Sequence, residues 1–153
     1  MLQHAWRGAP IIHETISISS YIYTYFEQKQ ILPKIEALII CSSNDGIEVG
    51  KAKGDAGLQE NIPYSWMSEL SVISEYRKCG VGREMFVEIC NTFRSHGYKS
   101  MRWCVESDRR QFDTASLTNI YLKFGARVLS NIEKKKSQRL STIMEYDLFT
   151  NHL

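Results

Sequence analysis

Residues 64–95 read YSWMSELSVISEYRKCGVGREMFVEICNTFRS, and this stretch decides the fold that we expect. An apolar segment runs to Ile73, and Gly80 and Gly82 lie at the start of a second segment, whose apolar residues recur every three or four positions. The recurring apolar residues are Val81, Met85, Phe86, Ile89, Cys90 and Phe93. The charged residues of that segment fall on its other side. The pattern predicts a strand, a turn that contains glycine, and a helix.

The turn between the predicted strand and helix favours an anion. Glycine lets the backbone bend close to a ligand, and the first N–H groups of a helix point outward without partners. The helix dipole and the side chains of Arg77, Lys78 and Arg83 add positive potential. A phosphate or pyrophosphate would therefore be stabilised at this turn. The alternative is that the two glycines only make a tight, closely packed turn, because the chain contains neither GxGxxG nor GxxxxGK[ST].

Three segments resemble the GNAT acyl-CoA N-acyltransferases. Arg77-x-x-Gly80-x-Gly82 is similar to the [RQ]xxGx[GA] signature of that family, and Leu70-Ser71-Val72 before it resembles the family's strand exit. Residues 120–126, IYLKFGA, resemble the segment LYxKxGF, and residues 44–50, NDGIEVG, resemble the hairpin xDGxxVG. The three segments occur in the family's order and together cover residues 34–148.

The resemblance implies an α/β fold with a mixed, mostly antiparallel sheet flanked by helices. Its central parallel pair, residues 64–73 and 101–106, would be splayed to admit acyl-CoA. The length of 153 residues suits a single domain covering residues 1–153. Residues 1–33 depart from the family, because they contain no good candidate for its first strand.

The N-terminal third is expected to begin with a helix. Ile11, Thr15, Ile18, Ile22 and Phe26 fit a helical stripe over residues 11–30, although the β-branched and aromatic run within it also suits a strand. We predict a helix because the periodicity continues too long for one strand. Strands are predicted at residues 35–41 and 47–53, joined by a turn, and residues 55–63 are predicted to be a polar loop.

The central strand is expected to alternate between two covered faces. Trp66, Ser68, Leu70 and Val72 would share one face, and Met67, Glu69, Ser71 and Ile73 the other. Further strands are predicted at residues 101–106, 128–131 and 143–148. A short helix is expected to begin at Asp113 or Thr114 and to end at Gly125, with Leu117, Ile120, Tyr121 and Phe124 on one face. Loops are expected at residues 107–113 and 134–136.

The resemblance also implies a reaction, the transfer of an acetyl group from acetyl-CoA to an amine by direct attack. Tyr121 matches the tyrosine that protonates the leaving thiolate in the family, although it could instead be a core tyrosine. Glu69 is the candidate base, because a carboxylate in the middle of a central strand is costly unless it is paired or functional. A water could take its place, Arg102 could simply neutralise it, and Glu106 is a weaker candidate.

The cofactor-binding residues implied by the resemblance lie on the central strand, in the turn and on the short helix. They are Leu70, Ser71, Val72, Arg77, Lys78, Cys79, Gly80, Val81, Gly82, Arg83, Thr114 and Tyr121. The backbone N–H near Val72 would hold the thioester oxygen. Thr114 stands where the family often has asparagine, so its contact with CoA would be weaker.

Composition argues against several classes of binding partner. A net charge of +2 is too small to indicate nucleic acid, and no apolar run is long enough to span a membrane. The four histidines are scattered, so no metal site is predicted. Cys41, Cys79, Cys90 and Cys104 form no CxxC pair, which favours buried free thiols and a cytoplasmic protein. A homodimer is possible.

Two alternatives to a small-amine acetyltransferase stay open. The same acyl-CoA site could serve an acceptor amine on a protein or on aminoacyl-tRNA. A non-catalytic acyl-CoA sensor or an interaction module would keep the site without the reaction. The sequence does not identify the acceptor.

Overall fold

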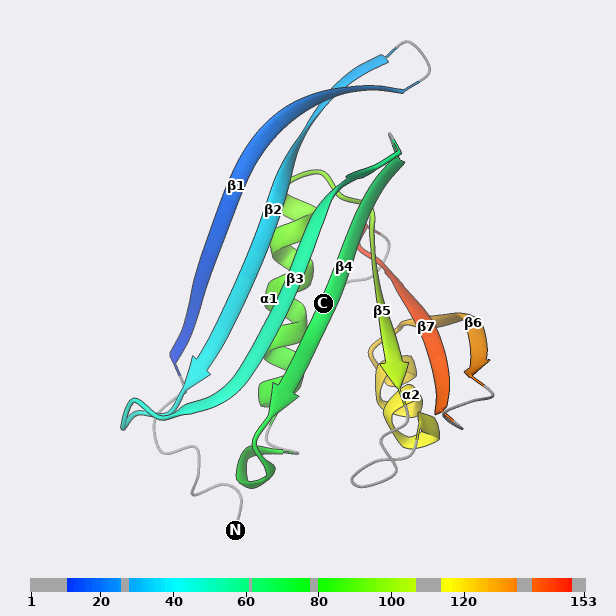
Figure 1. Cartoon of the computed structure of the whole chain (residues 1–153). Coiled ribbons are helices and arrows are strands. Elements are labelled where there is room, and N and C mark those ends of the chain that lie inside the picture. The colour runs from blue at the N-terminus through cyan, green and yellow to red at the C-terminus, as the bar shows by residue number, and fades with distance from the viewer. Residues whose placement is uncertain are drawn as a thin grey trace.

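The computed structural model describes residues 11–25, 28–60, 62–77, 80–106, 114–134 and 139–149. Their strands form one seven-stranded sheet in the order β1-β2-β3-β4-β5-β7-β6 (Figure 1). The strands are β1 (Ile11–Tyr25), β2 (Gln28–Ser42), β3 (Glu48–Gln59), β4 (Ile62–Val72), β5 (Ser100–Glu106), β6 (Arg127–Lys134) and β7 (Arg139–Asp147). The helices are α1 (Val81–Ser95), α2 (Thr114–Lys123) and the short 3-10 helix η2 (Ser74–Tyr76).

The sheet is mixed and mostly antiparallel. β4 and β5 are parallel and are joined through α1, whereas the other neighbouring strands are antiparallel. This arrangement confirms the predicted fold class and the predicted parallel pair.

The predicted helix over residues 11–30 is wrong, because the chain forms two long strands there. β1 pairs with β2 from Ile11 opposite Ser42 to Tyr25 opposite Gln28. The β-branched and aromatic residues of this segment favour a strand, and that preference prevailed. The argument from length failed because β1 has 15 residues, well beyond the usual length of a strand. The missing first strand of the fold is therefore present.

The predicted loop at residues 55–63 is also wrong. β3 continues to Gln59 and β4 begins at Ile62, so these residues form a hairpin with Asp55 opposite Trp66 and Gly57 opposite Tyr64. Polar residues are compatible with a strand when one face of the sheet meets solvent.

α1 packs on β2, β3 and β4 with the predicted apolar stripe. All six residues of that stripe are buried, which removes a large apolar area from water. Two glycines of β3 let the helix approach closely. A Cβ atom on Gly50 would lie 2.6 Å from Met85 Cε, and one on Gly54 would lie 2.8 Å from both Ile89 Cδ1 and the Trp66 carbonyl oxygen.

Both helices lie on the same face of the sheet. The Phe86 ring of α1 lies 5.3 Å from the Phe124 ring just after α2 and 6.1 Å from the Tyr121 ring. Leu117, Tyr121 and Phe124 pack against the core as predicted, whereas Ile120 is 44% exposed. Over the described part of the chain, no helix covers the other face, which we call the outer face (Figure 1). The expectation that the central strand is covered on both faces is therefore wrong.

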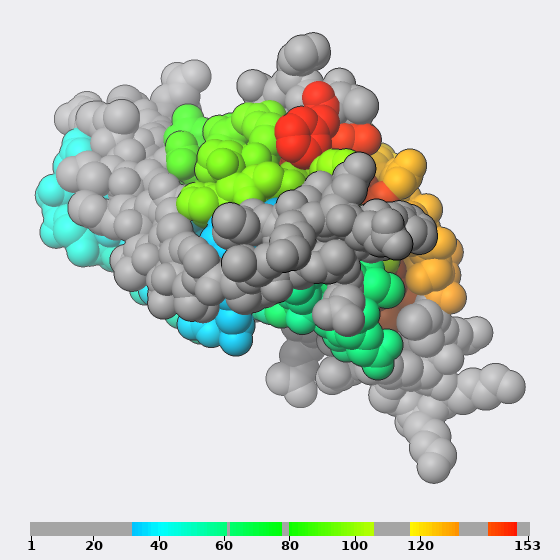
Figure 2. Space-filling model, turned by 90° about the horizontal axis from the view of Figure 1, so that it is seen from above, coloured from blue at the N-terminus to red at the C-terminus, as the bar shows by residue number. Residues whose placement is uncertain are grey.

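The end of β7 closes the sheet against the end of α1. Leu148 N–H donates to the Lys99 carbonyl at 2.9 Å, and Arg94 Nη1 donates to the Leu148 carbonyl at 3.4 Å. Figure 2 shows this contact from above, with the red C-terminal residues beside the light green end of the helix. Gly97, with φ of 98°, follows the end of the helix in a conformation that favours glycine.

Candidate active site

The parallel strands β4 and β5 separate after one residue pair. Trp66 lies opposite Arg102, and no further β4–β5 pair forms among the described residues. Figure 1 shows the two strands diverging toward their C-terminal ends. β4 also contains a bulge, since Glu69 lies opposite Lys53 and Met67 opposite Gly54, which leaves Ser68 without a register partner. We call the separation of β4 and β5 the splay, and it occurs at the same level of the sheet as the bulge.

The bulge changes which residues share a face. Leu70 and Met67 lie opposite Ala52 and Gly54, residues of the β3 face that α1 covers. Glu69 lies on the outer face, as Trp66 does. The predicted alternation is therefore wrong: Met67 shares a face with Leu70 and Val72, and Trp66 shares one with Glu69 and Ser71. An extra residue in a strand shifts every later side chain to the opposite face.

A cavity of 170 Å³ occupies the space between the diverging strands. Its lining residues are Met67, Ser68, Glu69, Leu70, Trp103, Cys104, Val105, Leu117 and Tyr121. The volume is comparable with the cavity of about 150 Å³ that accommodates benzene in an engineered protein. It can hold a small acyl group, and both candidate catalytic residues line it.

Tyr121 enters the cavity from the helix side. Its ring lies 4.9 Å from the Trp103 ring and is half-buried. Burial raises the pKa of Tyr121 to about 12, so the hydroxyl is protonated and can donate a hydrogen bond at neutral pH.

Glu69 enters the cavity from β4, on the outer face. It is half-buried, and Ser71 Oγ lies 3.4 Å from its Oε1 as a donor. Arg102 does not neutralise it, because Arg102 pairs with Glu145 at 2.7 Å. Across the cavity lies Cys104, half-buried and described as a free thiol; Cys41 and Cys90 are buried free thiols. The side chain of Glu106 lies outside the described residues.

The glycine turn leads from the end of β4 into α1. Gly80 has φ of 88°, a conformation that favours glycine, and Glu84 N–H donates to its carbonyl at 3.0 Å. A Cβ atom on Gly82 would lie 3.6 Å from Val72 Cγ2, which is an ordinary contact. Close packing therefore does not require glycine at position 82. Arg77 Nε donates to the Val72 carbonyl at 3.0 Å and ties the turn to β4.

The other predicted cofactor residues lie around the turn and along β4. Ser71 and Arg83 are exposed, and the Arg83 guanidinium carbon lies 5.8 Å from the centre of the Phe124 ring. Val81 is buried and belongs to the core rather than to the turn's surface. Lys78, Cys79 and the side chain of Thr114 lie outside the described residues.

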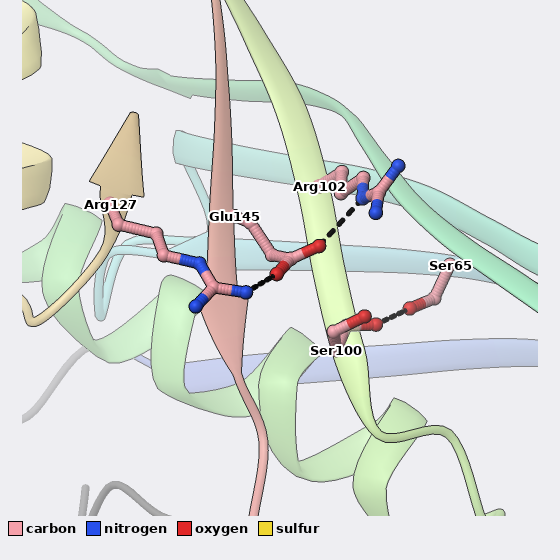
Figure 3. Close-up of polar contacts among 5 residues, drawn as sticks. All are labelled: Ser65, Ser100, Arg102, Arg127 and Glu145. Carbon is pink, nitrogen blue, oxygen red and sulfur yellow. Dashed lines mark hydrogen bonds and ion pairs between the residues drawn. The ribbon is translucent and has the colours of Figure 1, made fainter. Parts of the chain in front are cut away.

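A charged triad lies on the outer face beside the splay (Figure 3). Glu145, with only 6% of its side chain exposed, pairs with Arg102 and Arg127. Burial alone would raise the pKa of Glu145, but hydrogen bonds and positive charge from the two arginines outweigh burial and leave the pKa lowered. Nearby, Ser65 Oγ donates to the Ser100 carbonyl and joins β4 to β5 below the splay.

Sequence reasoning missed Ser68, Trp103 and Cys104 in the cavity wall. Nothing in the local sequence marks Ser68 as a bulge, because serine is compatible with regular strands. Trp103 and Cys104 lie on a predicted strand, but their position in the cavity depends on the splay. In the described part of the chain there is no cluster of metal-ligating side chains. No helix there is long and apolar enough to cross a membrane.

No protein-family model and no curated protein sequence matches the chain. Solved structures do match it. A Desulfovibrio desulfuricans protein assigned to the GNAT acetyltransferases has a TM-score of 0.63 and 13% identity over 74% of this chain and 69% of its own. An aminoglycoside 6'-N-acetyltransferase with bound coenzyme A has a TM-score of 0.60 and 14% identity, covering 77% of this chain and 76% of its own.

A third structure covers more of the chain. A Bacillus anthracis protein assigned as a streptothricin acetyltransferase, in complex with acetyl coenzyme A, has a TM-score of 0.61 and 10% identity over 88% of both chains. Identities this low show a shared fold and nothing finer. The chain has the fold of the GNAT acetyltransferases, as the sequence motifs predict.

Proposed function

We propose that this protein is an N-acetyltransferase that moves an acetyl group from acetyl-CoA to an amine. One observation carries the proposal: the cavity in the splay has a phenol on the helix side, Tyr121, and a carboxylate on the outer face, Glu69. Attack on a thioester and departure of its sulfur need a base and an acid on different sides of the reacting carbon. An amine would approach from the outer face, and the thiol would leave toward the helices.

Acetyl-CoA would bind along the edge of β4 that β5 leaves unpaired. Beyond Trp66 this edge can offer backbone N–H and C=O groups to the amides of the pantetheine arm, as an added strand would use them. The pyrophosphate would lie at the turn, where Gly80 and Gly82 leave the first N–H groups of α1 uncovered. One of the β4 N–H groups near the cavity would hold the thioester oxygen.

The reaction would proceed by direct attack. The neutral amine forms a bond to the thioester carbon, Glu69 or a water accepts the proton that the nitrogen loses, and the carbon–sulfur bond breaks. The sulfur takes a proton from Tyr121. A phenol with a pKa of about 12 is a weak acid for a thiolate whose reference pKa is about 8.5. Because the same burial would also raise the pKa of the thiol, the proton transfer is closer to balance inside the cavity than in water.

The test is thiol release from acetyl-CoA in the presence of a panel of primary amines, with the acetylated product identified by mass. We expect release that depends on one class of amine. If calorimetry shows that acetyl-CoA binds while no small amine, peptide or aminoacyl-tRNA is acetylated, the protein is an acyl-CoA sensor. If acetyl-CoA does not bind, the proposal fails altogether.

A further inference from the structure

A row of side chains crosses the outer face at the level where β4 and β5 still pair. Its members lie opposite one another on successive strands, and we call them the transverse row. In strand order they are Glu36, Asp55, Trp66, Arg102, Glu145 and Arg127. The row has two carboxylates on one side of the indole and two guanidinium groups, held by a carboxylate, on the other.

The guanidinium groups are held in position by a buried partner. Glu145 accepts from Arg102 Nε at 2.7 Å and from Arg127 Nη2, whereas the side chains of Arg102 and Arg127 are 54% and 70% exposed (Figure 3). The Nη groups of Arg102 make no other hydrogen bond or ion pair to the described residues. The triad carries a net charge of +1, from two guanidinium groups and one carboxylate. A fixed guanidinium with unused N–H groups suits a carboxylate.

A groove leads from this arginine to the cavity. Asp55, Tyr64, Trp66, Ser100 and Arg102 line a hollow of 740 Å³ at the start of β4 and β5. It adjoins a second hollow of 510 Å³, because Asp55 and Tyr64 line both. Ser68 lines this second hollow and the catalytic cavity as well. A molecule on the outer face can therefore reach the thioester at the bulge.

We propose that the acceptor amine carries a carboxylate, and that Arg102 binds this carboxylate on the outer face while the amine lies beside Glu69. This proposal rests on the acetyltransferase function proposed above. Trp66 and Glu69 lie opposite Asp55 and Lys53, which are two residues apart on β3. At about 3.4 Å per residue along the strand, and about 4.8 Å across from β4 to Arg102 on β5, the two groups of the acceptor would be on the order of 8 Å apart. An ω-amino carboxylate such as 6-aminohexanoate has about this span.

Lysines on the same face provide a control. Lys34 and Lys53 line the 510 Å³ hollow and are exposed, without a buried partner that fixes them in the described structure. Lys53→Gln removes one positive charge close to Glu69, as Arg102→Gln removes one beside Trp66. If the preference for an acceptor with a carboxylate depends on overall charge, both substitutions reduce it. If it depends on a specific site, only the substitution of Arg102 reduces it.

The experiment compares 6-aminohexanoate with its uncharged amide. Binding is followed by the NMR shift of the Trp66 indole N–H, assigned through Trp66→Phe, so that it does not depend on turnover. We expect the wild-type protein and Lys53→Gln to bind the acid at least about tenfold more tightly than the amide, and Arg102→Gln to lose this preference. Arg102→Lys keeps the charge but not the planar guanidinium, so its preference for the acid should be intermediate between those of the wild type and Arg102→Gln.

The same pair of amines is then tested for acetylation. Equal binding of acid and amide by the wild type, or a preference that survives in Arg102→Gln, overturns the carboxylate site. A preference in binding, without acetylation of these amines or of any amine in the panel described above, supports the site and rejects the proposed function. Acetylation of both amines at the same kcat/KM, with no preference in binding, supports the function and rejects the site.

Discussion

At the scale of single residues, the structure brings together two side chains that are 52 positions apart in the sequence, Glu69 and Tyr121. The motif around Tyr121 identified it as a candidate acid, and Tyr121 lines the cavity together with Glu69. The choice of Glu69 depended on a carboxylate in the middle of a strand. The expected burial on both faces was wrong, yet the residue lines the cavity because the bulge at Ser68 and the splay expose it there.

The first prediction concerns the hydroxyl of Tyr121. Tyr121→Phe keeps the ring that packs on Phe86 and Trp103, so the unfolding midpoint should not change. If the hydroxyl donates to the leaving sulfur, kcat should fall about 10²-fold or more, while the dissociation constants of acetyl-CoA and amine stay the same. Single-turnover kinetics checks this. If the rate of the chemical step is unchanged in the variant, Tyr121 is only a core residue and a water protonates the leaving sulfur.

The second prediction concerns Glu145 and pH. Because its folded-state pKa is lowered, Glu145 contributes stability at pH values above its ordinary pKa of 4.5, and this contribution is lost as the pH falls through the lowered value. Glu145→Gln should therefore cost about 1–2 kcal/mol at neutral pH, since both arginines are largely exposed. The difference in unfolding free energy between variant and wild type should shrink below pH 4.5. A constant difference at all pH values would contradict the ionic role.

At the scale of elements, the strand, turn and helix of residues 64–95 control the proposed cofactor site. The order of strand, turn and helix could be predicted because the helical periodicity is strong and two glycines mark the turn. In the structure Gly80 adopts a positive φ at the start of α1. It could not predict the contacts of β3 with α1. Gly50 lies within the predicted strand 47–53 and Gly54 directly after it, and nothing in the local sequence indicates that a helix packs closely against either glycine.

The third prediction uses the open space at Gly82. A side chain fits there without a clash, so Gly82→Asp tests charge rather than packing, and Gly82→Asn is a neutral control of nearly the same size. If the pyrophosphate lies at this turn, Asp should weaken acetyl-CoA binding by more than about tenfold relative to Asn. Calorimetry with each variant provides the comparison. Equal affinities for Asp and Asn would locate the phosphates elsewhere.

At the scale of the whole molecule, the strands and helices after residue 63 could be predicted, whereas the strands over residues 11–30 and 55–63 could not. The motifs from Asn44 to Ala126 implied the mixed, mostly antiparallel sheet and its parallel pair, and the structure contains both. The N-terminal error arose because a helical stripe and a long strand share β-branched residues, and no local signal distinguishes a strand of 15 residues from a helix. β1 and β2 are separated by residues 26 and 27 alone, so no helix lies between them.

The outer face, which no helix covers in the described part of the chain, is where we place the acceptor. The splay, the bulge and the transverse row depend on pairing between residues distant in the sequence, so they became visible only in the structure. The single domain over residues 1–153, the cytoplasmic location and the possible homodimer stay predictions.

The most direct test of the central claim is a crystal structure of the protein with acetyl-CoA. We predict that the pantetheine arm lies between β4 and β5 and pairs with the edge of β4 beyond Trp66, with the sulfur in reach of the Tyr121 hydroxyl. The pyrophosphate should lie against the first N–H groups of α1. Acetyl-CoA bound outside the splay, or a splay closed by continued β4–β5 pairing in the complex, would contradict the account.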